Sequence, residues 1–299
     1  MYPSHPIRYI DPVYRPPSEA DSLILPLTDG CSWNRCTFCE MYTAPQKKFR
    51  ARDEAETLQT ISACGQRFGA DVRRVFLADG DALVLPTRRL LEVLQAIRTH
   101  LPAVRRVSSY CLPRNLRKKS AAELKELADA GLKIVYVGAE SGDDTVLGRV
   151  SKGETYVSTC DALLKLGEAG IARSVMILNG LGGKAFWQQH AENSARLANA
   201  TQPEYLATLV VSFPHGEDRL RAGFPEWEPL SVSELLAEME YFIARLDLQR
   251  TVFRSDHASN WLVLKGTLGA DQEKLLTQVR AALAHPENAP LRPAWARGL

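Results

Sequence analysis

Short apolar runs alternate with amphipathic segments along most of this chain. The runs hold few polar residues, as expected of strands that are buried on both faces of a parallel sheet. The segments between them carry apolar residues at helical spacing, and two of them open with a capping box, a serine followed three residues later by glutamate. The predicted strands are residues 22–28, 72–78, 104–110, 132–138, 171–178 and 205–213. The predicted helices are residues 54–68, 87–101, 120–130, 155–169, 184–200 and 231–247.

Alternation of strand and helix implies right-handed β-α-β crossovers in an α/β fold. A barrel and an open doubly wound sheet both satisfy this pattern. The positions of the unusual residues favour a barrel, because (β/α) barrels build their active sites from loops at the C-terminal ends of the strands. Segments of this kind follow five predicted strands: the cysteine-rich loop after residue 28, and residues 79–81, 110–111, 140–142 and 179–180.

The two ends of the chain differ from this repeating pattern. Residues 1–20 are rich in proline and tyrosine and are predicted to form an extended arm. Residues 21–250 form the predicted core, and residues 251–299 a C-terminal extension that holds one more short strand, a helix over residues 270–284 and a proline-containing coil. Within this extension, Arg254 to Asn260 is dense in polar side chains. It is equally consistent with a hydrogen-bonded turn and with a segment that closes the barrel and contacts substrate.

Composition narrows the class of protein. The 299 residues are 45% hydrophobic and 24% charged, which is ordinary for a soluble globular protein. A net charge of +2 favours no nucleic acid partner, and the short clusters Lys47-Lys48 and Arg117-Lys118-Lys119 are interpreted as solvated loop charges. We expect neither a signal peptide nor a membrane span. Six cysteines without a secretory signal indicate a reduced, cytoplasmic protein in which clustered thiols mean metal binding or catalysis.

Three of the cysteines, Cys31, Cys36 and Cys39, follow one another with the spacing C-x4-C-x2-C. Thiolate is the soft ligand that selects zinc, copper(I) or iron–sulfur clusters. Structural zinc takes four protein ligands, and no fourth cysteine or histidine lies near this loop. Three thiolates suit a four-iron cluster with one iron open to another ligand. From the spacing alone, an iron–sulfur site and a zinc loop remain alternatives.

The loop resembles the cluster loop of the radical S-adenosylmethionine (radical SAM) enzymes, whose usual pattern is C-x3-C-x2-C with an aromatic residue before the last cysteine. Phe38 occupies the aromatic position, and this chain has one extra residue between the first two cysteines. Asp79-Gly80-Asp81, by itself typical of a turn, resembles the Gly-acid element of that family at the end of the second strand. Residues 138–153 resemble the G-x-E-S-G-x-x-x-x-L…K-G run of the branch that includes the methylthiotransferases and the oxygen-independent coproporphyrinogen oxidases.

The resemblance covers roughly Asp21 to Phe213 and implies a partial (β/α)6 TIM-like barrel, which residues 251–299 would extend. It implies that Cys31, Cys36 and Cys39 hold a 4Fe-4S cluster whose open iron binds SAM. Reductive cleavage of SAM, with an electron from a flavodoxin or ferredoxin, would give a 5′-deoxyadenosyl radical that abstracts hydrogen from substrate. The resemblance also implies the residues that contact SAM: Phe38, Asp79, Gly80 and Asp81 (the last three at its amino group), Glu140 and Ser141 (ribose and methionine), Lys152 (carboxylate), and Ile177 or Leu178 (adenine).

The substrate is less constrained than the enzyme class. Cys111 ends the third strand, and a lone cysteine is most often a small buried hydrophobe; the alternative is a catalytic hydrogen-atom donor or substrate contact. The chain shows no second cysteine cluster, which argues against methylthiolation, so we expect a small-molecule substrate. Three alternatives stay open: an RNA- or peptide-modifying radical SAM enzyme, a zinc-binding structural or interaction protein, and a metal-independent barrel enzyme with an incidental thiol loop.

Overall fold

The structure is a computed structural model that describes residues 5–297. The chain divides into two compact units. The first comprises Met1–Asn34, Cys39–Val137 and Lys165–Arg173; the second comprises Arg35–Phe38, Gly138–Leu164 and Ser174–Leu299. Each is described by itself. No helix within the described residues has the length and apolar composition needed to cross a membrane.

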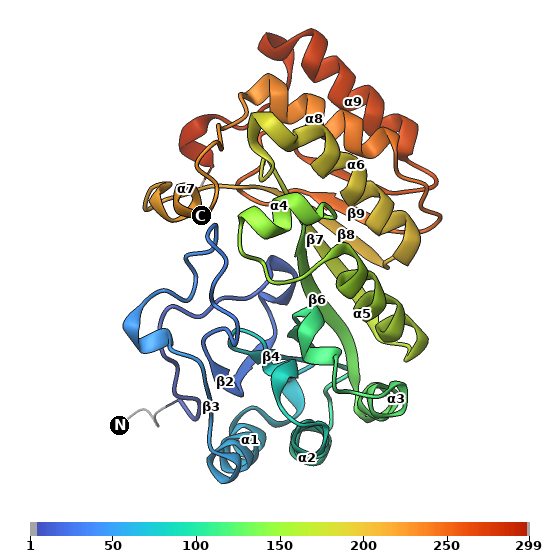
Figure 1. Ribbon diagram of the computed structural model, residues 1–299. Coiled ribbons are helices and arrows are strands. Elements are labelled where there is room, and N and C mark those ends of the chain that lie inside the picture. The colour runs from blue at the N-terminus through green and yellow to red at the C-terminus, as the bar shows by residue number, and fades with distance from the viewer. Residues whose placement is uncertain (1–4, 298–299) are drawn as a thin grey trace. The chain divides into compact units, whose positions relative to one another are not determined.

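The first unit is built on parallel strands in the order β1-β4-β5-β6. These strands are β1 (Leu23–Pro26), β4 (Arg74–Ala78), β5 (Arg106–Tyr110) and β6 (Leu132–Glu140), the last of which continues into the second unit. The connecting helices are α1 (Glu54–Phe68), α2 (Thr87–His100) and α3 (Ala121–Ala130), labelled in Figure 1. A short antiparallel pair, β2 (Thr28–Asp29) and β3 (Arg50–Ala51), flanks the cysteine-rich loop.

The second unit continues the alternation with strands in the order β7-β8-β9-β10. They are β7 (Ala172–Asn179), β8 (Tyr205–Val210), β9 (Val252–Ser255) and β10 (Leu264–Thr267), and only the β9–β10 pair is antiparallel. The helices are α4 (Asp144–Arg149), α5 (Tyr156–Glu168), α6 (Gly183–Thr201), α7 (Asp218–Gly223), α8 (Val232–Ala244) and α9 (Gln272–Ala284), several of which are labelled in Figure 1.

The predicted elements agree with the structure, except where an element is very short. All six predicted strands and the predicted helices are present, and the capping boxes at Ser120 and Ser231 both form. Helices α4 and α7 were not predicted, because six residues are too few for a helical period to show. The C-terminal extension holds two strands, β9 and β10, where one was predicted; each has only four residues.

Each unit has an apolar core beside its strands. In the first unit, Phe76 packs against Tyr110 with ring centroids 5.1 Å apart, and buried Ile134 completes that group. In the second unit, Phe224 and Trp227 belong to a buried apolar cluster that also contains Val146 of α4 and Leu220 of α7. The predicted N-terminal arm belongs to the first unit. Its Tyr9 hydroxyl donates a hydrogen bond to the carbonyl oxygen of Ile24 in β1 (2.9 Å).

Candidate active site

The root of the cysteine-rich loop is packed tightly against the Asp79-Gly80-Asp81 element. Gly30 has φ +74°, and a Cβ there would lie 2.0 Å from the carbonyl oxygen of Lys47. Gly80 has φ +72°, and a Cβ there would lie 1.9 Å from the carbonyl oxygen of Gly30. At both positions the backbone is left-handed and a second backbone lies too close for a side chain, so only glycine fits. The loop therefore leaves and returns at one place, directly beside the Gly-acid element.

The Asp81 carboxylate holds the first turn of the loop. One of its oxygens accepts the Ser32 backbone N–H at 2.7 Å, and the other accepts the Ser32 hydroxyl at 2.5 Å and the Asn115 side-chain amide at 2.9 Å. Burial raises the pKa of Asp81, and the hydrogen bonds from Ser32 and Asn115 offset part of that effect. Protein donors thus occupy both oxygens of this carboxylate.

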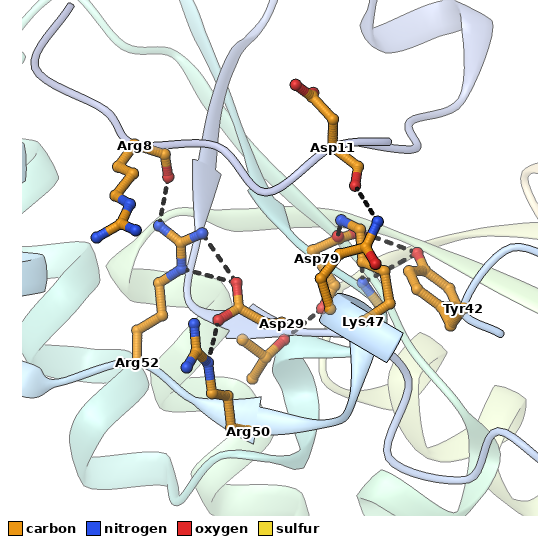
Figure 2. Close-up of polar contacts among 11 residues, drawn as sticks. Arg8, Asp11, Asp29, Tyr42, Lys47, Arg50, Arg52 and Asp79 are labelled. Atoms are coloured by element: carbon orange, nitrogen blue, oxygen red, sulfur yellow. Dashed lines mark hydrogen bonds and ion pairs between the residues drawn. The ribbon is translucent and has the colours of Figure 1, made fainter. Parts of the chain in front are cut away.

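Asp79 anchors the far end of the same loop (Figure 2). Its carboxylate forms an ion pair with the Lys47 ammonium at 2.5 Å, and the exposed fractions of the two side chains are only 1% and 2%. The other oxygen accepts the Tyr42 hydroxyl and the Gly80 N–H, each at 3.0 Å. Burial, followed by the Asp79 charge, raises the pKa of Tyr42 well above its ordinary value, so the phenol stays protonated as a donor.

The interpretation of Lys47-Lys48 and Arg117-Lys118-Lys119 as solvated loop charges is wrong for Lys47 and Lys119. Lys119 is buried, and its ammonium donates to the carbonyl oxygen of Leu85 at 2.6 Å. Lys47 is buried against Asp79, whereas Lys48 is exposed. Nothing in the local sequence distinguishes the two residues. A buried lysine is rare unless it is paired, and here the partner lies 32 residues further along the chain.

The cysteines of the loop are thiols, and all three are half-buried. Cys31 and Cys39 belong to the first unit, and Cys36 to the second. There the carbonyl oxygen of Cys36 accepts the Arg219 guanidinium at 3.2 Å, and the Thr37 N–H bonds to the carbonyl of residue 150 at 3.0 Å. Three cysteines close together in the sequence are the donor type that an iron–sulfur cluster requires.

Within residues 5–297, no group of three His, Cys, Asp or Glu side chains is arranged to hold a metal ion. The three cysteine ligands therefore remain a prediction that rests on the spacing of the motif and on the family described below.

Glu140 and Lys152, which the sequence predicted as separate contacts of SAM, form an ion pair with each other. The Lys152 ammonium lies 3.0 Å from Glu140 Oε1 and 5.8 Å from the centre of the Phe38 ring. Glu140 has φ +66°, a conformation that costs a residue with a Cβ about 1–2 kcal/mol. Its carboxylate folds back over Gly138, where a Cβ would lie 2.1 Å from Oε1. A strained, partly exposed carboxylate at a strand end is a candidate ligand contact.

Ser141, by contrast, serves the interior of the second unit. Its side chain is fully buried, its hydroxyl lies 2.8 Å from His190 Nδ1, and it accepts the Asp143 N–H at 3.0 Å. His190 Nε2 lies 3.0 Å from the Leu178 carbonyl oxygen, which can only accept, so Nε2 carries the proton and Nδ1 accepts from Ser141. Burial lowers the pKa of His190 to about 4, which keeps the ring neutral.

Glu238, on α8, continues this buried network at the end of β7. One carboxyl oxygen accepts the Gly180 N–H at 2.6 Å and the Asn179 amide at 3.3 Å. Burial raises the pKa of Glu238 to about 8, so the group is mostly protonated at neutral pH. Two residues of this network, Glu238 and His190, were absent from the predicted site. Glu238 did carry a signal, because it lies at helical spacing between the apolar residues Leu235 and Phe242.

The remaining predicted residues are placed as follows. Ile177 is buried, whereas Leu178 is half-buried and packs on the apolar cluster of the second unit. Cys111 is buried, and its thiol donates to the carbonyl oxygen of Leu112 at 3.3 Å. Their roles toward adenine and substrate stay predictions.

The fold and motifs of this chain are those of one enzyme family. The family model described as "Radical SAM superfamily" matches residues 25–191, more than half of the chain. The chain belongs to the radical SAM superfamily. It is an enzyme of that superfamily, whose cofactors are a 4Fe-4S cluster and SAM.

Individual relatives agree with this assignment. The heme chaperone HemW of Bacillus subtilis (strain 168) is 24% identical over 186 residues, which cover 59% of this chain and 47% of HemW. Among solved structures, coproporphyrinogen III oxidase HemN of Escherichia coli has a TM-score of 0.54 at 15% identity, covering 75% of this chain and 51% of HemN. The radical SAM methyltransferase TsrM of Kitasatospora setae has a TM-score of 0.50 at 19% identity, covering 62% of this chain and 36% of TsrM.

These likenesses confirm two predictions, the α/β fold of the radical SAM partial barrels and the resemblance to the coproporphyrinogen oxidase branch. The matched region spans about half the length of HemW and HemN.

Proposed function

We propose that this enzyme cleaves SAM reductively and uses the resulting 5′-deoxyadenosyl radical to abstract hydrogen from a small-molecule substrate. One observation carries the proposal: the cysteine-rich loop is rooted directly on the Asp-Gly-Asp element through the Gly30–Gly80 approach and the Ser32–Asp81 hydrogen bonds. The root of the loop, Gly30 to Ser32, and the Asp-Gly-Asp element are thus joined within the first unit, and both belong to motifs expected to serve one cofactor site.

The residues divide into those that would hold the cofactors and those that position the loop. Cys31, Cys36 and Cys39 would hold the cluster, which, when reduced and bound to SAM, supplies the radical. Asp79 and Asp81 are occupied by protein donors. We therefore propose that these two carboxylates position the loop. The backbone of this element, including Gly80, would then contact SAM.

Glu140 and Lys152 are the proposed polar contacts of SAM in the second unit. Their side chains are 12% and 5% exposed and form an ion pair with each other. In the proposed site, the Lys152 ammonium would donate to a carboxylate of SAM, and the Glu140 carboxylate would accept from a hydroxyl group. Phe38, Leu178 and Ile177 would supply the apolar contacts. In this proposal Ser141 does not contact SAM; its hydrogen bond with His190 positions the turn after β6.

The substrate and the electron donor belong to the same proposal. HemW, HemN and TsrM differ in what they act on, so their names assign no substrate to this chain. A small molecule, with the electron supplied by a flavodoxin or ferredoxin, fits the absence of a second cysteine cluster. We also propose residues 21–250 as the catalytic core, with residues 251–299 as an extension of it.

Anaerobic reconstitution with iron and sulfide, followed by dithionite and SAM, tests the proposed function. We expect about four irons per chain and formation of 5′-deoxyadenosine. A Cys36→Ala, Cys39→Ala variant is expected to lose both. Zinc at one per chain, or a cluster that never cleaves SAM, would overturn the proposal.

Binding of SAM to the reconstituted protein tests the Glu140–Lys152 assignment separately. Loss of a charge-assisted hydrogen bond in Lys152→Met should weaken SAM binding by about tenfold or more, measured by equilibrium dialysis. Lys184→Met is the matched control in the same unit, because Lys184 is half-exposed and lies 3.8 Å from its partner Glu228. Equal affinities for the two variants would remove Lys152 from the site.

A further inference from the structure

Buried polar atoms without hydrogen-bond partners gather at one place in the second unit. Among residues 5–297, eleven buried side-chain nitrogen or oxygen atoms have no partner. Three of them, Asn179 Oδ1, Ser255 Oγ and Asn260 Oδ1, belong to residues that line a single cavity. Each of these side chains is 3% exposed or less. Folded proteins rarely leave such atoms unpaired, so their grouping marks a place where a water molecule or a ligand group completes them.

The size and lining of the cavity limit what it can take. Its volume is about 20 Å³, slightly more than the smallest space that holds one water molecule. Apart from the three polar residues, the lining is apolar and includes Leu236 and Met239. None of the lining residues is ionisable. A charged group would lose its hydration here without a counter-charge, so the cavity suits a single uncharged polar group.

The hydrogen bonds around the cavity define the polarity of that group. The Asn179 amide nitrogen donates to Glu238, and the Asn260 amide nitrogen donates to the carbonyl oxygen of Thr208 at 2.8 Å. Each carboxamide nitrogen thus has a protein acceptor for one of its N–H groups, which leaves two carbonyl oxygens and the Ser255 hydroxyl as the atoms without partners. Two acceptors and a hydroxyl require a ligand that donates N–H or O–H bonds.

The cavity lies where substrates enter folds of this kind. Asn179, Val210 and Ser255 each end a strand, and the three strands β7, β8 and β9 are parallel neighbours. Ligands of α/β folds bind outside the carboxyl ends of such strands. Trp261, which directly follows the polar segment Arg254 to Asn260, is half-buried at the same cavity.

We propose that Asn179, Ser255 and Asn260 form a substrate subsite that accepts one uncharged hydrogen-bond donor group, a hydroxyl or a carboxamide NH2. The identification of the ligand as substrate rests on the proposed function; the polarity and size of the group follow from the cavity itself.

Methionine methyl NMR tests this subsite without knowledge of the substrate. The chain has four methionines, and Met239 lines the cavity, so its 13C-labelled methyl signal, assigned with a Met239→Leu variant, reports on occupancy. The probe is acetamide, added to the cluster-loaded protein, and N,N-dimethylacetamide is the matched probe without N–H donors. We expect acetamide to shift the Met239 signal saturably and N,N-dimethylacetamide to leave it unchanged.

Ser255→Ala is the matching protein variant. The Ser255 hydroxyl has no protein partner, so its removal should leave the unfolding midpoint unchanged while weakening acetamide binding about fivefold to tenfold. Thr159→Val is the control, because the Thr159 hydroxyl is also buried without a partner but lies on α5, outside the lining of the cavity. That variant should bind acetamide as the wild type does.

Three results would overturn the subsite: a Met239 signal that acetamide does not move, as for a cavity that holds only water; equal shifts with both amides; or unchanged binding in Ser255→Ala. If the wild type forms 5′-deoxyadenosine but Met239 does not respond, the subsite is wrong and the proposed function stands. If acetamide binds as expected but SAM is never cleaved, the cavity is a binding site for a hydrogen-bond donor, and its identification as the substrate subsite of a radical enzyme is wrong.

Discussion

Replacing Lys47 with methionine is the most direct test of how the cysteine-rich loop is held. Methionine keeps most of the side-chain volume but removes the ammonium that pairs with Asp79 at 2.5 Å. Because Asp79 is 2% exposed, its carboxylate would then be left buried opposite an apolar group. Breaking a buried ion pair by removing one partner costs about 3–5 kcal/mol. Tyr42 and Gly80 still donate to Asp79, so we expect the lower part of that range.

The double variant Lys47→Met, Asp79→Asn separates the ion pair from general damage to the core. No charge is left buried in it, and the carboxamide oxygen introduced at this position can still accept from Gly80, so the cost should be about 2 kcal/mol or less below wild type. The single variant Asp79→Asn, which leaves the Lys47 ammonium buried without its charge partner, completes the cycle. The double variant should therefore cost clearly less than the two single variants together. The assay is urea unfolding of the metal-free, reduced protein, followed by circular dichroism.

Lys48→Met is the control, because this neighbouring lysine is exposed; its effect should stay within about 0.5 kcal/mol. The reasoning is refuted if Lys47→Met costs less than about 1 kcal/mol, or if the single and double variants are additive. As a second readout, Lys47→Met should take up less iron than Lys48→Met during reconstitution, since the far end of the loop has lost its anchor.

Three further predictions follow from the same contacts. Gly80→Ala should destabilise the protein by about 3 kcal/mol or more in urea unfolding, because it adds a backbone clash to the left-handed strain, whereas Gly170→Ala, at φ +77° with nothing within 4 Å, should cost only about 1–2 kcal/mol. Glu238 has a folded-state pKa of about 8, above its unfolded value, so the folded state binds one more proton than the unfolded state in this range. The free energy of unfolding should therefore fall as pH rises from about 6.5 to 8. Below pH 6.5 the lowered pKa of His190 has the opposite effect on stability and offsets this trend. Glu238→Gln should be flat over this upper window, and a wild-type curve that is already flat there would contradict the assignment. Cys111→Ala should alter the product without abolishing 5′-deoxyadenosine formation, measured by mass spectrometry, and an unchanged product would leave Cys111 as a buried packing residue.

Much of the fold was predictable because its signals are local. A buried parallel strand, an amphipathic helix and a capping box each occupy a few consecutive residues, and their order defines an α/β fold. The family was predictable for the same reason: C-x4-C-x2-C, Asp-Gly-Asp and the Glu-Ser-Gly run are contiguous motifs. Short elements, among them β3, α4, α7 and one tail strand, lacked enough residues to show a pattern.

The roles of individual polar residues were decided by the tertiary structure. Lys47 and Lys48 are chemically identical neighbours, yet only the first meets a buried carboxylate, 32 residues away. Ser141, which the motif predicts beside SAM, has its hydroxyl bonded to His190, 49 residues away. A sequence shows which groups can donate, accept or carry charge. Whether such a group is solvated, paired or left open for a ligand depends on burial and on distant partners, which exist only once the chain has folded.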